Sequence, residues 1–96
     1  MIEFDWVKCQ RNVVERNLSF ERANEVDLEA ALISRDERQN YGEDRYVALC
    51  HLDKRLHVLC FTETIRGIRV ISFRKANKRE VLHYEKKQAN STLTFR

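Results

Sequence analysis

Two apolar segments separated by only two residues constrain the fold of this chain more than any other feature. Residues 44–52 and 55–63 are each rich in apolar side chains, and only Asp53 and Lys54 lie between them. A two-residue connection between strands is typical of a tight β-hairpin, and such a turn fixes how the strands pair. The sequence therefore predicts a hairpin with a defined register.

That register assigns each hairpin side chain to one face of the sheet. It pairs Val47 with Cys60, Leu49 with Val58, Arg45 with Thr62 and Cys50 with His57. Apolar residues then fall on both faces, which is typical of strands covered on both sides. We expect the hairpin in the middle of a sheet, with the thiols of Cys50 and Cys60 on opposite faces.

The remaining elements follow in order along the chain. We expect a strand at 2–5, a helix at 6–16 capped by Asp5, a second helix at 20–26 capped by Ser19, and a strand at 30–34. Asn17 suits the left-handed residue that ends a helix, and Val13 is expected on the inner side of the first helix. The prediction is one α+β domain over residues 1–96: an N-terminal helical hairpin packed on a mostly antiparallel sheet, a C-terminal helix, and a frayed polar tail after about residue 88.

Composition excludes several classes of protein. No apolar run approaches the ~20 residues of a membrane span, so we expect a cytoplasmic protein without a membrane partner. The net charge of +3 permits a nucleic-acid or acidic protein partner without proving either. Cys50 and His57 face each other but lack a third ligand, and no phosphate-binding or dinucleotide motif is present. We therefore expect no metal and no cofactor.

Basic residues concentrate between residues 66 and 84. A strand that begins at Gly67 ends at Arg74 and Lys75, and Asn77 with Glu80 three residues later indicates a capping box at the start of a helix. Arginines at a strand end beside a basic helix can hold a phosphate group. The alternative is an ordinary solvated helix face, which is the more common role of a charge run.

No serine or cysteine nucleophile with its own base is visible, but RNA supplies a nucleophile in its 2′-hydroxyl group. Cleavage then requires a proton acceptor, a proton donor and fixed positive charge at the phosphate. Glu43 and Arg45 share one face where a strand begins. Each candidate has a plainer alternative: a surface ion pair for Glu43 and Arg45, a helix-flanking charge for Arg74, and packing against the sheet for Tyr84.

An ordered set of short motifs resembles the BrnT-type toxins, the ribonuclease halves of bacterial type II toxin–antitoxin pairs. The matching residues are Phe4-Asp5, Lys8, Asn12, Leu18-Ser19-Phe20, Ala23, Tyr41-Gly42-Glu43, Arg45, Arg69-Val70-Ile71-Ser72, Arg74, Ala76, Glu80 and Tyr84. The resemblance implies a RelE-like fold, RNA cleavage that arrests growth, and neutralisation by a cognate antitoxin. Such an antitoxin, BrnA-like, is a small DNA-binding protein, so operator DNA would be contacted only through it.

The chain departs from the family pattern at three places. Phe4-Asp5 replaces Trp-Asp, Glu15-Arg16-Asn17 replaces Lys-His-Gly, and Thr64 stands where an arginine often follows Thr-Glu. If the missing histidine or arginine is catalytic, this chain is weakly active or inactive. Arg66 is close enough in sequence to replace the arginine that is absent at Thr64.

These residues lead to a metal-independent endoribonuclease as the first hypothesis. Arg45 and Arg74 would stabilise the phosphate, Glu43 would act as the base, and Tyr84 would orient the substrate or act as the acid. The RNA backbone would be contacted by Lys8, Arg69, Lys75, Lys78 and Arg79. The alternatives are a non-catalytic degenerate toxin, a regulator that binds RNA or DNA together with an antitoxin, or an RNA-binding domain whose basic helix contacts phosphates.

Overall fold

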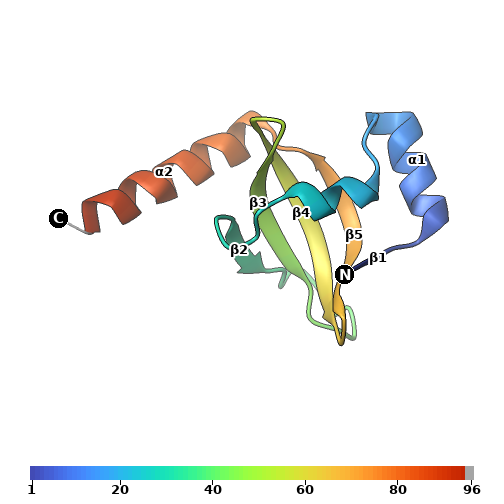
Figure 1. Cartoon of the computed structure of the whole chain (residues 1–96). Coiled ribbons are helices and arrows are strands. Elements are labelled where there is room, and N and C mark those ends of the chain that lie inside the picture. Colours follow the sequence, from blue (N-terminus) through green and yellow to red (C-terminus); the bar gives the residue numbers. More distant parts are fainter. Residues whose placement is uncertain (95–96) are drawn as a thin grey trace.

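The central hairpin forms as predicted in the computed structural model, which describes residues 1–94 (Figure 1). Strand β3 spans Tyr46–Leu52 and β4 spans Arg55–Thr64. The two turn residues have φ angles of 52° and 63°, so both are left-handed as in a type I′ turn. The pairs Val47–Cys60, Leu49–Val58 and Cys50–His57 are all present, and the ladder ends at Tyr46–Phe61, just short of the expected Arg45–Thr62 pair.

The hairpin lies inside a five-stranded sheet of order β1-β5-β4-β3-β2. Strand β2 (Leu32–Arg35) pairs antiparallel with β3, and β5 (Gly67–Lys75) pairs antiparallel with β4. The short β1 (Ile2–Glu3) pairs parallel with β5 at the other edge. The predicted α+β class and mostly antiparallel sheet are therefore confirmed, although β2 begins two residues later than the predicted start at Ala30.

One face of the sheet is covered by the N-terminal helices. Helix α1 (Trp6–Arg16) begins at Asp5, whose carboxylate accepts from the backbone amides of the first turn, and ends at the left-handed Asn17. The second helix, η1 (Phe20–Glu25), is a 3-10 helix capped by Ser19. The main core lies between these elements and the sheet; its buried members include Cys9, Phe20, Leu59 and Phe73.

The helical prediction was wrong about Val13, and the second helix forms at the expected place as a 3-10 helix. Val13 is 42% exposed. It lies one helical turn after Cys9 on the same side of α1, but burial in this helix is limited to Cys9. The segment after Ser19 makes i→i+3 contacts rather than an α-helix, since the amide of Val26 donates to the carbonyl of Ala23. The six residues of η1 make less than two turns of an α-helix, and they form a 3-10 helix that is longer than most.

On the other face of the sheet, helix α2 covers the part near the hairpin turn. Helix α2 (Lys78–Thr94) begins with the predicted capping box, in which Asn77 and Glu80 exchange two hydrogen bonds of 2.9 Å. Val81 and Tyr84 pack on a small cluster formed by Leu49, Leu56, Val58 and Ala76. The helix then projects away from the sheet (Figure 1) and continues to Thr94, so the segment after residue 88 is helical where a frayed tail was expected. Within residues 1–94, no helix is long and apolar enough to cross a membrane.

A β-bulge in β5 decides which side chains reach that second face. The β4–β5 register shifts between Cys60 and Phe61, where β5 contains one extra residue, Ile71. Residues five apart in a regular strand point to opposite faces. The extra residue reverses this alternation, so Arg69 lies opposite Thr62 and points to the same face as Arg74.

Candidate active site

The face of the sheet opposite α1 carries a series of arginines along β5 and the adjoining loop. Arg74 lies opposite Val58, and Arg69 lies opposite Thr62. Thr62 lies four positions after Val58 in β4, which corresponds to about 13 Å along a strand. Helix α2 covers the end near Arg74, and the loop that carries Glu43 lies at the end near Arg69.

Glu43 joins two of these arginines across the mouth of the sheet. Its carboxylate accepts from Arg45 Nε at 3.1 Å and from Arg69 Nη2 at 2.9 and 3.0 Å. Hydrogen bonds from Arg45 and, with a smaller effect, from Arg69 hold the pKa of Glu43 below its usual range. The cluster borders a cavity of about 300 Å³ that Thr62 and Thr64 also line. Glu43 is therefore ionised at neutral pH and held by two guanidinium groups.

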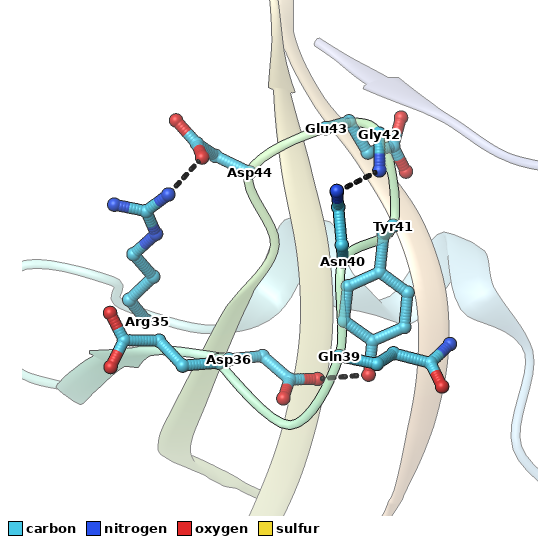
Figure 2. Close-up of a pocket in the computed structure, with 9 residues that line it drawn as sticks. Arg35, Asp36, Gln39, Asn40, Tyr41, Gly42, Glu43 and Asp44 are labelled. Carbon is cyan, nitrogen blue, oxygen red and sulfur yellow. Dashed lines mark hydrogen bonds and ion pairs between the residues drawn. The ribbon is translucent and has the colours of Figure 1, made fainter.

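A buried carboxylate anchors a third guanidinium beside this cluster. The side chain of Asp36 is 2% exposed and receives two hydrogen bonds from Arg38, at 2.8 and 2.7 Å. It also accepts from the Tyr41 hydroxyl at 3.1 Å (Figure 2), and the Arg45 guanidinium lies 4.1 Å from the centre of the Tyr41 ring. Hydrogen bonds from Arg38 hold the pKa of Asp36 well below its usual range.

Sequence reasoning missed this anchor, because residues 36–41 lie between two predicted strands in a segment that predicts only a polar loop. The loop encloses a cavity of about 750 Å³ that Asp36, Tyr41 and Glu43 all line (Figure 2). The sequence did contain a signal. Asp36 lies two residues before Arg38, and Tyr41 follows three residues after Arg38. An acid at this spacing can accept hydrogen bonds from both side chains and close a short loop.

Arg74 is held by a carboxylate of its own. Its two terminal nitrogens donate to the two Glu80 oxygens at 2.9 and 2.8 Å, and Nη1 also donates to the Lys75 carbonyl at 3.2 Å. The hydrogen bonds with Glu80 raise the pKa of Arg74, and the nearby positive charge of Arg38 opposes that rise. Arg38, Arg45, Arg69 and Arg74 are hereafter called the arginine face. Each of them is paired with a carboxylate that fixes its position.

The other predicted residues lie at different distances from this face. Tyr84 is one helical turn beyond Glu80 and makes an edge contact with His51, with 5.3 Å between ring centres. Lys78 and Arg79 are exposed in the first turn of α2. Lys8 is on α1, and Lys75 pairs with His57 on the opposite side of the sheet from Arg74. The structure thus brings Glu43, Arg45 and Arg69 into contact, and it does not bring Lys8 or Lys75 to them.

The departures from the expected pattern also have defined positions. The Thr64 hydroxyl is buried without a hydrogen-bond partner among the described residues. Arg66 lines a separate cavity with Met1 and Glu3, whereas Arg69 lines the cavity that contains Thr64 and Glu43. Arg69 rather than Arg66 is therefore the guanidinium positioned beside Glu43.

The cysteines provide no nucleophile. All three are buried as free thiols, and burial raises the pKa of Cys50 to about 11, so its reactive thiolate form is scarce at neutral pH. Within residues 1–94, no group of three or more His, Cys, Asp or Glu side chains is arranged to hold a metal ion.

Comparison with known proteins identifies one family. The model of the family described as ribonuclease toxin, BrnT, of type II toxin-antitoxin system matches residues 4–80. The matched segment contains all four arginines of the arginine face and their three carboxylate partners. No curated protein shows significant sequence similarity to the chain.

Proposed function

This chain belongs to the BrnT family of ribonuclease toxins of type II toxin–antitoxin systems, and we propose that it cleaves RNA at the arginine face by attack of the 2′-hydroxyl group on the adjacent phosphate. The observation that supports this site is the contact of Glu43 with both Arg45 and Arg69. It places a proton acceptor within hydrogen-bonding distance of two groups that can bind a phosphate.

In this proposal the arginines bind and stabilise the phosphate. Guanidinium groups bind phosphate through two parallel hydrogen bonds, and these strengthen as negative charge develops during the reaction. Arg45 and Arg69 would contact the reacting phosphate. Arg38 and Arg74 would hold a neighbouring phosphate of the RNA backbone. The carboxylates hold these side chains in place before RNA binds, which lowers the entropic cost of binding.

Glu43 is the proposed base, and substrate binding would increase its strength as a base. In the free protein its pKa is lowered by Arg45 and Arg69, and a lower pKa makes a weaker proton acceptor. A phosphate that draws the guanidinium of Arg45 or Arg69 away from Glu43 would weaken this hydrogen bond and raise the pKa of Glu43. Glu43 would then accept the 2′-hydroxyl proton only when substrate is bound. The proposal uses no metal ion, and Tyr84 remains the candidate that orients RNA or donates a proton.

The family assignment also supports a set of partners. We infer a cognate antitoxin resembling BrnA, a small DNA-binding protein that covers the arginine face and alone contacts operator DNA. The fold would be RelE-like, with α1 and η1 as its N-terminal helical hairpin, and the protein would act in the cytoplasm. Lys78 and Arg79 would contact the RNA backbone from α2, and Lys8 and Lys75 would do so only if RNA continued around the edge of the sheet.

A non-catalytic member of the family is the second candidate. Every guanidinium of the arginine face is already paired with a carboxylate, and the buried Thr64 hydroxyl stands where the family often has an arginine. A protein with these features could bind RNA or an antitoxin without cleaving RNA. It would then act as a regulator in the complex.

One experiment separates the two candidates. Total RNA is incubated with the purified chain in the presence of EDTA, beside a Glu43→Gln variant and an Arg69→Ala variant. The proposal predicts cleavage by the parent, slower cleavage with near-normal RNA affinity for Glu43→Gln, and losses of both affinity and rate for Arg69→Ala. An intact parent that binds RNA without cleaving it would support the non-catalytic candidate.

A further inference from the structure

A second concentration of positive charge lies on the side of the sheet that faces α1. A pocket of about 300 Å³ opens between the last turn of α1, the helix η1 and the hairpin turn; the end of α1 and the hairpin turn are near the top of Figure 1, and η1 lies below them. Its charged and titratable lining residues are Arg16, Arg22, Asp53, Arg55, His57 and Lys75. They come from five segments of the chain, so the fold rather than a local charge run brings them together. We call this cavity the basic pocket.

The walls of the basic pocket are fixed by one strong ion-pair network. Arg22 donates two hydrogen bonds of 2.8 Å to Asp53 and two of 2.9 Å to Glu25. These contacts tie η1 to the hairpin turn. Arg22 is shared between two carboxylates, Asp53 in the pocket lining and Glu25 outside it, so its positive charge is not free for a ligand.

The other cations of the pocket have no such balance. Among the described residues, none of the salt bridges involves Arg16, Arg55 or Lys75. The arginine face differs in this respect, because each of its guanidiniums is paired with a carboxylate. Three uncompensated positive charges around one small cavity repel one another, and a bound anion would relieve that repulsion.

The floor of the pocket includes a buried histidine. His57 is 3% exposed, and its Nδ1 lies 2.8 Å from the Arg55 carbonyl. A carbonyl oxygen only accepts, so Nδ1 carries the proton and the ring is fixed in orientation. The ring also packs against Phe73, with 5.6 Å between ring centres. The pocket thus has a histidine of fixed orientation on the sheet beside its cationic side chains.

We propose that the basic pocket binds a terminal phosphate group, that is, a phosphate monoester at the end of a nucleotide or of an RNA strand. A monoester carries about −1.5 to −2 charges at neutral pH, whereas a backbone diester carries one, so the monoester matches three free cations better. The volume suits a phosphate with its sugar and leaves a base outside. The site lies on the opposite side of the sheet from the arginine face and does not depend on RNA cleavage.

The test locates binding by NMR on the full, isotopically labelled chain. Titration with adenosine monophosphate and with inorganic phosphate should shift the amide signals of residues 16–18, 53–57 and 75, and titration with adenosine should not. The double variant Arg55→Ala, Lys75→Ala should bind adenosine monophosphate roughly 10- to 100-fold more weakly, because two charge-assisted contacts are lost. Removing the same charge elsewhere, by Arg11→Ala with Lys86→Ala, should leave the affinity within about threefold of the parent.

A second titration distinguishes the source of the phosphate. A short DNA strand cannot be cleaved through a 2′-hydroxyl, so its 5′-phosphorylated and 5′-hydroxyl forms can be compared directly. Preference for the phosphorylated strand indicates a strand-end site, and binding of adenosine monophosphate alone indicates a free-nucleotide site. Signals that shift only around Glu43, Arg69 and Arg74, or equal affinity of the pocket variant and the parent, would overturn the proposal.

Discussion

Replacing Arg74 by lysine tests whether the fork geometry of its guanidinium matters to catalysis. Arg74 makes two hydrogen bonds to Glu80, at 2.9 and 2.8 Å, and lysine keeps the charge but cannot reproduce that planar pair of donors. In our account the same fork binds a phosphate in the substrate. Because Arg74 is assigned to a phosphate beside the reacting one, the lost contact is a charge-assisted hydrogen bond that positions the substrate, which costs ~1.5–3 kcal/mol, or roughly ten- to a hundred-fold in kcat/KM.

Arg74→Lys should change the free energy of unfolding less than it changes the activation free energy of cleavage. The Arg74 and Glu80 side chains are 36% and 24% exposed, so solvent screens the pair and the loss of unfolding free energy should be about 1 kcal/mol or less. For a chain of this size that lowers Tm by ~8 °C at most. The two predictions together require a large loss of rate in a protein that remains folded.

The assay compares kcat/KM on a fluorescent RNA, in EDTA, with Tm measured on the same samples. Arg11→Lys is the control, because Arg11 is exposed on α1, away from the arginine face. The control should cleave RNA within about threefold of the parent. If Arg74→Lys also cleaves within tenfold of the parent, the role assigned to Arg74 is wrong.

Three further predictions concern binding, pH and partners. The double variant Lys78→Ala, Arg79→Ala should weaken RNA binding for all sequences and reduce the salt slope by roughly one unit per lost contact, and an unchanged slope would place the RNA elsewhere. Hydrogen bonds from Arg38 lower the pKa of Asp36 in the folded protein. The stability that these hydrogen bonds contribute is therefore complete above the unfolded-state pKa of ~3.9, and it is lost as pH falls through the folded-state pKa. Thermal melts should therefore show a shallower loss of Tm below about pH 4 for Asp36→Asn than for the parent, and equal slopes would contradict the anchor. Coexpression with the antitoxin should give one complex by size exclusion, with the Glu43 and Arg69 amides protected from hydrogen exchange; separate elution would contradict that interface.

The central part of the fold could be predicted from sequence because its determinants are local. Asp53 and Lys54 fix the hairpin register, and Asp5, Asn17, Ser19 and Asn77 mark helix ends through contacts with residues only a few positions away. Each of these signals depends on backbone angles or on hydrogen bonds that involve only residues a few positions apart. Such contacts do not require knowledge of the tertiary structure.

The candidate site could be predicted only in part because it depends on one irregularity. Arg69 and Arg74 share a face only through the extra residue in β5, and no Gly or Pro marks the bulge in the sequence. The contact of Glu43 with Arg69 joins residues 26 positions apart and reaches across the end of β4. Asp36 was missed because the burial of its side chain depends on how residues 36–45 fold back over the sheet. None of these three features follows from the spacing of apolar residues along the sequence.

The most direct test of the central claim is cleavage of an RNA in which one 2′-hydroxyl is removed. A cleavage site is first mapped in a short RNA incubated with the parent protein and EDTA. The same RNA is then made with deoxyribose at the nucleotide on the 5′ side of that site. Our account predicts that cleavage at this position falls to the level without protein, that neighbouring sites are still cut, and that products of the normal RNA end in a 2′,3′-cyclic phosphate. Cleavage of the substituted RNA at the parent rate would contradict it.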